Sequence, residues 1–371
     1  MQPSKKFDQH RIDVLDYARF AAALSVMLFH YSYIGIKYGA VGSISYMGKI
    51  TDIGRYGYLG VELFFIISGF VIFTSSNGRT ASQFFVARAL RLYPAYIFCV
   101  LLTGLVLIMF GNPASPVSLR QVIANFSMLA PAFGEKHLDA SYWTLGVELK
   151  FYAAVFFIIL FGFSRHLEKF FLAWGIAILA ASIGNFNAFP SLSGYCSYFC
   201  AGALFAVRMK KKSWPLNMLL VACLYYSLNF SCIESLQIKE VQFLSPELIA
   251  IIVCAFYLFF LAISSGKFSQ LSLPAARQLG IVTYPLYLVH QSVGYVIISR
   301  FATEENKVLV LIITMSTMIL LAFLVHHCSE VKPAKFWKSC FHVFFGQPVT
   351  WCEKQISKAR MKLKILPSIT R

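Results

Sequence analysis

Two ionisable side chains in the first apolar stretch are the residues most able to do chemistry. Arg19 and His30 are eleven residues apart, so an α-helix would place both on one face, roughly 16 Å apart. Ionisable groups in apolar spans are costly and usually mark function. Because imidazole titrates near neutral pH, it is a natural general base toward a hydroxyl. We predict catalytic roles for His30 and Arg19, and an ion pair between Arg19 and Asp16, which lies one turn earlier.

Other polar side chains recur in later apolar stretches. Glu148 is the candidate to orient His30 or to serve as a second acid or base. The full set of substrate-binding or structural candidates is Asp16, Glu62, Ser68, Trp143, Tyr284 and His290.

Two arginines, Arg88 and Arg91, open the third apolar stretch. Three residues apart on one helical face, two guanidinium groups make a clamp for phosphate, because each offers a planar fork of donors. The alternative is that they are ordinary cytoplasmic flanks of a membrane span.

Composition predicts the fold that must position these residues. The chain is 58% hydrophobic and 13% charged, which excludes an ordinary soluble domain. Apolar stretches near 20 residues long recur, which is the length that crosses a bilayer. We predict an all-α fold, a polytopic membrane bundle of about ten transmembrane helices. The predicted spans are 14–34, 59–76, 84–110, 142–162, 169–188, 192–208, 214–232, 246–264, 279–299 and 308–328.

The basic residues predict the orientation. With ten spans, most of the 33 Lys and Arg residues fall in cytoplasmic segments, as the positive-inside rule requires. We therefore expect a cytoplasmic segment 1–13, a membrane domain 14–328 and a basic cytoplasmic tail 329–371. Within the tail, the stretch Lys354 to Lys364 is expected to form a membrane-surface helix. Segment 121–133 is too short to span and is expected to be interfacial or re-entrant.

The net charge and the cysteines exclude other site classes. A charge of +17 marks the face turned toward anionic lipid, and no soluble basic domain is present to bind nucleic acid. The nine Cys are scattered singly. Cys196 and Cys200 have no further ligand to complete a metal set, so neither a metal site nor a disulfide framework is expected.

Five stretches together resemble the acyltransferase-3 family of integral membrane acyltransferases, over about Asp13 to His326. The first resembles its Arg-x10-His signature, the second its second-helix signature with Glu62 where Asp is common, and the third its Arg-x-x-Arg element. The fourth is similar to its Trp-Ser-Leu-x-x-Glu signature with Thr144 in place of Ser, and the fifth to its Tyr-Leu-x-His signature, with an unusual Pro285. In order, these are Leu15 to His30, Gly60 to Phe70, Arg88 to Pro94, Trp143 to Tyr152 and Leu279 to His290.

The resemblance implies an acyl-CoA donor, usually acetyl-CoA, used as a co-substrate with no permanently bound cofactor. It implies a hydroxyl acceptor on a surface glycan or its lipid-linked precursor, such as lipopolysaccharide O-antigen, capsule or exopolysaccharide. Coenzyme A phosphates would bind Arg88 and Arg91, and the thioester would meet His30. The chain would lie in the bacterial inner membrane with both termini cytoplasmic. Direct transfer in a ternary complex is preferred, although an acetyl-histidine intermediate is also chemically possible. Acyl transfer needs donors to a tetrahedral oxyanion, and Ser68, Trp143 and Tyr284 are the candidates for that role.

Two other classes of protein compete with this interpretation. A secondary transporter of a small polar or anionic solute also places charges at the membrane midplane, but it predicts an internal repeat that the sequence lacks. A non-enzymatic scaffold leaves Arg19, His30 and Glu148 without a purpose. Movement of a labelled acyl group to a polymer, rather than of an intact solute across the membrane, discriminates among these classes.

Reporter fusions test the predicted topology. Fusions at Lys211, Arg277 and Lys358 are expected to report cytoplasm, and fusions at Gly111 and Glu240 the opposite side, because the basic loops then all face inward. If segment 121–133 truly spans, every later loop inverts. A cytoplasmic signal at Glu240 would therefore refute the ten-span arrangement.

Overall fold

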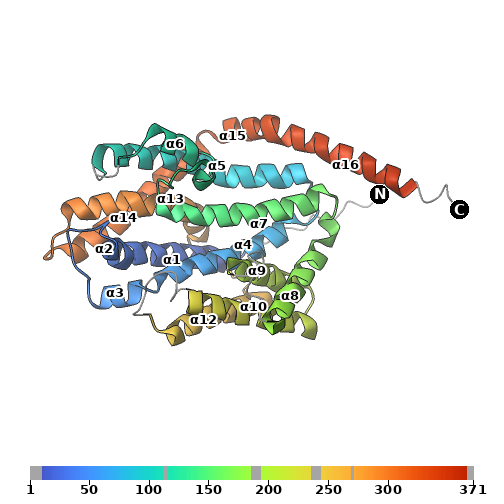
Figure 1. Ribbon diagram of the computed structural model, residues 1–371, viewed down its shortest axis with the longest axis horizontal. Coiled ribbons are helices and arrows are strands. Elements are labelled where there is room, and N and C mark those ends of the chain that lie inside the picture. The colour runs from blue at the N-terminus through green and yellow to red at the C-terminus, as the bar shows by residue number, and fades with distance from the viewer. Residues whose placement is uncertain (1–10, 112–115, 185–193, 235–243, 269–270, 366–371) are drawn as a thin grey trace. The chain divides into compact units, whose positions relative to one another are not determined.

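The computed structural model describes the 371-residue chain apart from residues 1–10, 112–115, 185–193, 235–243, 269–270 and 366–371 (Figure 1). Within the described ranges the secondary structure is helical and includes no strand. Eight helical stretches there are long and apolar enough to cross a membrane. Helices suit lipid because they satisfy their own backbone hydrogen bonds. The prediction of an all-α, polytopic membrane bundle is confirmed.

The eight candidate spans are built from the following elements: α1 (Asp13–Phe29), η1 (His30–Ile34) and α2 (Gly35–Lys37); α3 (Lys49–Gly54), η2 (Gly57–Leu59) and α4 (Gly60–Ser76); α5 (Ala81–Phe110); η4 (Ala140–Tyr142) and α7 (Trp143–Leu160); α10 (Trp214–Asn229) and η6 (Phe230–Glu234); α12 (Pro246–Ser264); α13 (Ala276–Phe301); and α14 (Lys307–Val325) with η7 (His326–Val331). The other two predicted spans, 169–188 and 192–208, correspond to α8 (Leu167–Gly184) and α9 (Tyr195–Lys210). These two helices flank residues outside the described ranges, so the count of ten stays a prediction.

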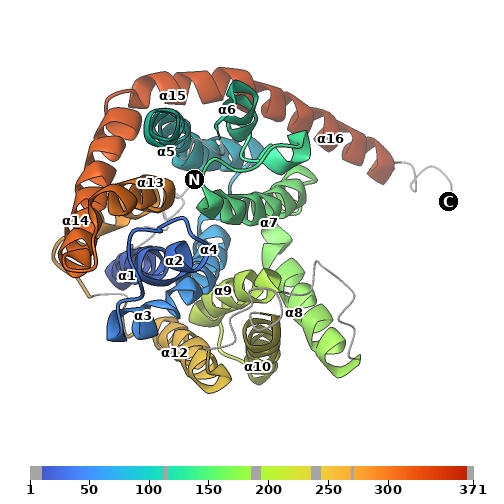
Figure 2. The same cartoon turned by 60° about the vertical axis from the view of Figure 1, so that its left-hand side comes forward.

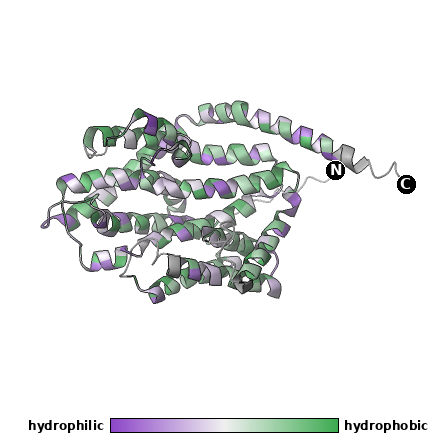
Figure 3. Ribbon diagram, viewed as in Figure 1, coloured by the Kyte–Doolittle hydropathy of each residue, from purple (hydrophilic) through white to green (hydrophobic). Residues whose placement is uncertain are grey.

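The short elements fit the sequence pattern. Segment 121–133 contains the 7-residue helix α6 (Leu119–Asn125) and the turn η3 (Ala130–Phe133). At 1.5 Å per residue neither can cross a bilayer. The turn η5 (Ser164–His166) joins α7 to α8. Figure 3 shows apolar residues predominating along most helices, as a lipid-exposed surface requires.

The chain divides into two compact units. One unit comprises Met1–Arg19, Glu62–Asn77 and His166–Arg277, and the other comprises Phe20–Val61, Gly78–Arg165 and Gln278–Arg371. In the first unit, α10 packs against α8, α9 and α12, as Figure 2 shows. In the second unit, α5 is covered by the tail helices α15 (Ala334–Phe341) and α16 (Gln347–Ile365), which are joined by η8 (His342–Gly346).

Glycines allow two helices of the first unit to touch backbone to backbone. A Cβ added at Gly69 of α4 would overlap the Phe199 carbonyl, and one added at Gly202 of α9 would overlap the Ile66 carbonyl. Small residues at such crossings are the usual route to close packing in membranes, where water does not drive helices together. Gly69 and Gly202 therefore set the spacing between α4 and α9.

The tail holds the beginning of α5 in the second unit. Helix α5 starts with a capping box in which Thr80 and Gln83 pair reciprocally. The Glu353 carboxylate of α16 accepts hydrogen bonds from the backbone N–H groups of Ala81 and Ser82. A carboxylate is favoured at a helix N-terminus because the unpaired N–H groups there carry partial positive charge. This contact ties the basic tail to the helix that carries Arg88.

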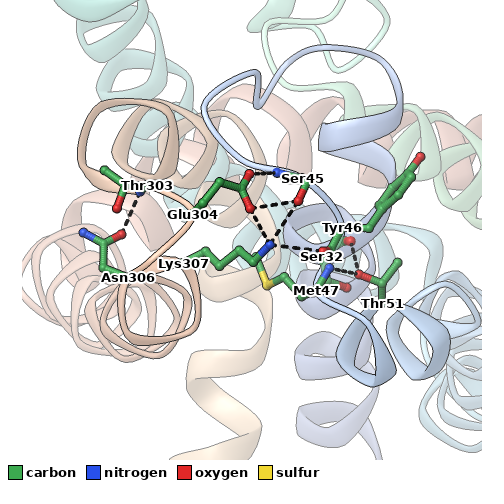
Figure 4. Close-up of polar contacts among 9 residues, drawn as sticks. All are labelled: Ser32, Ser45, Tyr46, Met47, Thr51, Thr303, Glu304, Asn306 and Lys307. Carbon is green, nitrogen blue, oxygen red and sulfur yellow. Dashed lines mark hydrogen bonds and ion pairs between the residues drawn. The ribbon is translucent and has the colours of Figure 1, made fainter.

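The loop after the first span is tied to the turn between α13 and α14 (Figure 4). Lys307 Nζ lies 3.0 Å from Ser45 Oγ and 2.7 Å from a Glu304 carboxylate oxygen. Hydrogen bonds from Lys307 and Ser45 lower the pKa of Glu304 to about 2. Since this is below the ordinary carboxyl pKa of about 4.3, the contact stabilises the fold above that value and is lost as the pH falls toward 2.

Substitution of Gly202 tests the close helix contact. Gly202→Ala is expected to lower the thermal unfolding temperature in detergent, because overpacking costs about 1–3 kcal/mol. Gly146→Ala in α7 is the matched control, since the atom nearest to its added Cβ is Leu129 Cδ2 at 4.0 Å. Alanine also favours a helix interior by up to about 1 kcal/mol. Equal unfolding temperatures for the two variants would show that α4 and α9 do not depend on this contact.

Candidate active site

Two imidazole rings from distant parts of the sequence meet in the second unit. His30 follows the last residue of α1, and His290 lies on α13. His290 Nε2 is 3.0 Å from His30 Nδ1, and the ring centroids are 4.9 Å apart. His290 is 1% exposed, whereas His30 is partly exposed. A buried imidazole therefore stands directly behind a more accessible one.

Backbone carbonyls fix the proton positions on both rings. His30 Nδ1 lies 2.8 Å from the Val26 carbonyl oxygen, and His290 Nδ1 lies 2.7 Å from the Tyr287 carbonyl oxygen. A carbonyl oxygen only accepts, so we assign the proton of each neutral ring to Nδ1. His290 Nε2 then accepts from the His30 Nδ1–H, which it shares with the Val26 carbonyl. The basic lone pair of His30 consequently resides on Nε2.

Tight packing between η1 and α13 sets this ring contact. The Tyr31 hydroxyl donates to the His290 carbonyl, and Tyr31 is fully buried. A Cβ at Gly294 would overlap the Tyr31 ring, so this position on α13 has room only for glycine. The π-helical turn η1 begins at His30 itself. Such turns are rare and frequent at functional sites.

Asp139 supports the same part of α13 from the end of a loop. It is 0% exposed, and it accepts from the Ser292 backbone N–H at 2.8 Å and from the Ser141 N–H at 3.0 Å. The Ser141 hydroxyl also donates to it. In a membrane each unpaired backbone group costs several kcal/mol. Asp139 therefore supplies the hydrogen-bond acceptor for the backbone N–H of Ser292, two residues beyond His290 on α13.

Helix α7 carries two polar side chains, Thr144 and Glu148, that hydrogen-bond tyrosine hydroxyls. Thr144 Oγ1 lies 2.8 Å from the Tyr287 hydroxyl on α13. Glu148 accepts a short hydrogen bond from Tyr152, one turn further along α7. His290 Nε2 is one hydrogen-bond partner of the His30 ring, and a role for Glu148 stays a prediction. Trp143 is 38% exposed at the start of the helix.

Arg88 and Arg91 each lie over a tyrosine ring. The Arg88 guanidinium carbon is 5.8 Å from the Tyr152 centroid, and that of Arg91 is 5.4 Å from the Tyr284 centroid. Within the described residues neither forms an ion pair with a carboxylate, and the buried Arg88 Nε has no hydrogen-bond acceptor. Aromatic faces orient guanidinium groups without using their donors. These donors thus remain available for an anion.

A third arginine lies near this pair, outside the spans. Burial and the positive charge of Arg88 lower the pKa of Arg79, which precedes α5 by two residues. The two cations are close enough to repel each other. A bound anion would relieve that repulsion.

The comparisons with known proteins decide the family. A model of an acyltransferase domain, Acyl_transf_3, matches residues 12–327. The chain belongs to the acyltransferase-3 family. It is also similar to the exopolysaccharide production protein ExoZ of Rhizobium meliloti (strain 1021), with 32% identity over 105 residues. That match covers 26% of this chain and 32% of the relative, so the similarity spans about a third of that protein. No solved structure matches the chain significantly.

The other predicted site residues of this acyltransferase-3 chain belong to the first unit. Asp16 Oδ1 is 3.2 Å from Arg19 Nη1, so the predicted ion pair is confirmed, and Asp16 also accepts from Arg11 Nε at 2.6 Å. Glu62 is 2% exposed on α4, where Ser68 also lies. The structure thus brings seven of the predicted residues into the second unit: His30, Arg88, Arg91, Trp143, Glu148, Tyr284 and His290.

Sequence reasoning missed Asp139 and Gln291 in this family member. Asp139 stands immediately before the turn that opens α7, where an acidic N-cap is a recognisable signal. Gln291 follows His290 within a predicted span. A polar side chain at that depth is a signal in its own right.

Asp139 is expected to be essential for stability. Asp139→Ala removes the carboxylate that accepts from the backbone N–H groups of Ser292 and Ser141, so a loss of about 3 kcal/mol or more is predicted. The control is Asp52→Ala, because Asp52 is 60% exposed in a surface ion pair with Arg55 and should change stability by less than about 1 kcal/mol. Thermal unfolding in detergent compares the two variants. Similar unfolding temperatures would contradict the role of Asp139.

Proposed function

We propose that this chain is a membrane-bound acyltransferase that moves an acyl group, acetyl in the simplest case, from coenzyme A to a hydroxyl of a cell-surface glycan. The observation that carries this proposal is the His30–His290 pair, which presents a lone pair on His30 Nε2. Family membership supports acyl transfer. The similarity to a protein named for exopolysaccharide production supports a glycan acceptor.

His30 acts as the general base in this proposal. Its Nε2 takes the proton of the acceptor hydroxyl as that oxygen attacks the thioester carbonyl. The C–O bond forms, the C–S bond breaks, and the coenzyme A thiolate leaves and takes the proton back from His30. A sugar hydroxyl ionises poorly near neutral pH, so a positioned base is worth about 10²–10⁴-fold in rate.

His290 stabilises the charged form of that base. When Nε2 of His30 is protonated, its Nδ1–H becomes a stronger donor to Nε2 of His290. Because His290 donates its own proton to the Tyr287 carbonyl, it holds the acceptor orientation throughout. His290 therefore works as a neutral counterpart of the carboxylate in a Ser-His-Asp triad.

In this proposal the acyl donor, acyl-CoA, binds next to Arg88 and Arg91. Arg88 and Arg91 are held over tyrosine rings, the Arg88 Nε–H has no acceptor in the described part of the chain, and Arg79 adds a third charge. A coenzyme A molecule carries a pyrophosphate and a ribose phosphate, which suit forked guanidinium donors. The membrane domain 14–328, the cytoplasmic tail 329–371 and an inner-membrane location with cytoplasmic termini belong to the same proposal.

Three proteins at matched abundance test this function. Membranes containing wild type, His30→Ala or Arg88→Gln with Arg91→Gln receive [¹⁴C]acetyl-CoA and de-O-acetylated surface polysaccharide from the source strain. His30→Ala is expected to lose transfer by at least about 10²-fold while keeping its affinity for coenzyme A. The arginine double variant is expected to lose mainly that affinity.

Each outcome has a distinct meaning. Equal transfer by wild type and His30→Ala would remove His30 from the chemistry. An unchanged affinity for coenzyme A in the double variant would reduce the arginines to topology signals. If wild type moves no label to the polysaccharide, and mass spectrometry shows the same surface glycans with and without the protein, the proposed function is wrong.

A further inference from the structure

Gln291 is buried next to the histidine pair with part of its side chain unused. It is 8% exposed, and its Oε1 has no hydrogen-bond donor anywhere in the described part of the chain. Tyr295, one turn further along α13, lies close enough to interact with this side-chain amide. Buried polar atoms are nearly always paired, and the exceptions call for an explanation.

Helix geometry places Gln291 on the face that contacts His30. At about 100° per residue, Gln291 lies about 100° from His290, and Tyr295 lies about 140° from it. The His30 ring touches both flanking residues, since its centroid is 4.9 Å from that of His290 and 6.3 Å from that of Tyr295. Gln291 lies between those two contacts in both angle and height. Gln291 is therefore on the side of α13 that faces His30.

The properties of Gln291 Oε1 indicate which chemical group could be its hydrogen-bond partner. Oε1 only accepts, so its partner must carry an O–H or N–H group. The reacting end of a thioester has neither. The hydroxyl under attack gives its proton to His30 Nε2. A second donor on the acceptor molecule, beside the reacting hydroxyl, meets the requirement.

We propose that Gln291 binds a second hydroxyl or amide N–H of the acceptor glycan and so selects which hydroxyl His30 deprotonates. This inference rests on the proposed acyltransferase function and names a specificity-determining residue for it. An amide is well suited to this task. It stays neutral beside the imidazoles at every relevant pH, and it rejects ligands that would leave its oxygen unpaired.

The structural explanation of Gln291 is weaker. A methionine would fill a similar volume with no polar atom to satisfy, and packing in a membrane does not require an amide. The oxygen has no donor in the described part of the chain. A ligand donor accounts for it.

The test compares Gln291→Met with Gln278→Met in membranes supplied with [¹⁴C]acetyl-CoA and de-O-acetylated surface polysaccharide of the source strain. Gln278 is exposed near the beginning of the same helix, so its variant controls for the substitution itself. Gln291→Met is expected to reduce kcat/KM for the polysaccharide about 10- to 100-fold. The KM for acetyl-CoA and the affinity for coenzyme A should stay within about twofold. Product NMR should show acyl groups spread over neighbouring hydroxyls.

Several results would overturn the inference. An unchanged polysaccharide KM with unchanged acyl position would do so. A loss confined to acetyl-CoA KM would assign the oxygen to an amide of the donor instead. If Gln291→Met does not accumulate, Gln291→Asn is measured in its place. Its side chain is one methylene shorter, so kcat/KM for the polysaccharide is again expected to fall. Failure of wild type to label the polysaccharide would refute the acyltransferase proposal itself, before any variant is compared.

Discussion

The hydrogen bond between His30 and His290 is the interaction on which the rest of the site depends. An imidazole can work as a base only if its lone pair points toward the reacting hydroxyl, and a histidine ring has two nitrogens that could carry the proton. Here the Val26 and Tyr287 carbonyls indicate which nitrogen carries the proton, because each carbonyl accepts from an Nδ1–H. With the protons assigned in this way, the lone pair of the neutral His30 ring is on Nε2, the atom proposed as the base.

Holding two rings in that arrangement inside a membrane constrains the surrounding helices. Tyr31 reaches the backbone of His290 across a gap that only Gly294 leaves open. The Asp139 carboxylate accepts a hydrogen bond from the Ser292 N–H, two residues after His290. In water such groups could turn to solvent, but in lipid they must find partners within the protein. The loop before α7 therefore stabilises a helix from a distant part of the sequence, and the proposed base depends on both.

Features that depend on neighbouring residues could be predicted from the sequence. The helical class follows from hydropathy, and the Asp16–Arg19 ion pair follows from a spacing of one turn. The importance of His30 follows from its depth in an apolar span. The pairing of His30 with His290 joins residues 260 positions apart, which one sequence without tertiary contacts does not specify. The same limit hid Asp139, whose partner lies on another helix, and the orphaned oxygen of Gln291.

The proton position on His30 is the most direct test of this account. Solid-state ¹⁵N NMR of protein labelled at histidine nitrogens, with His30→Asn used to assign the His30 signals, distinguishes the two neutral tautomers. In the neutral His30 ring, Nδ1 is expected to be protonated and Nε2 unprotonated. A His30 ring with its proton on Nε2 would contradict it, because the lone pair would then face His290 and Val26 instead of the acceptor hydroxyl.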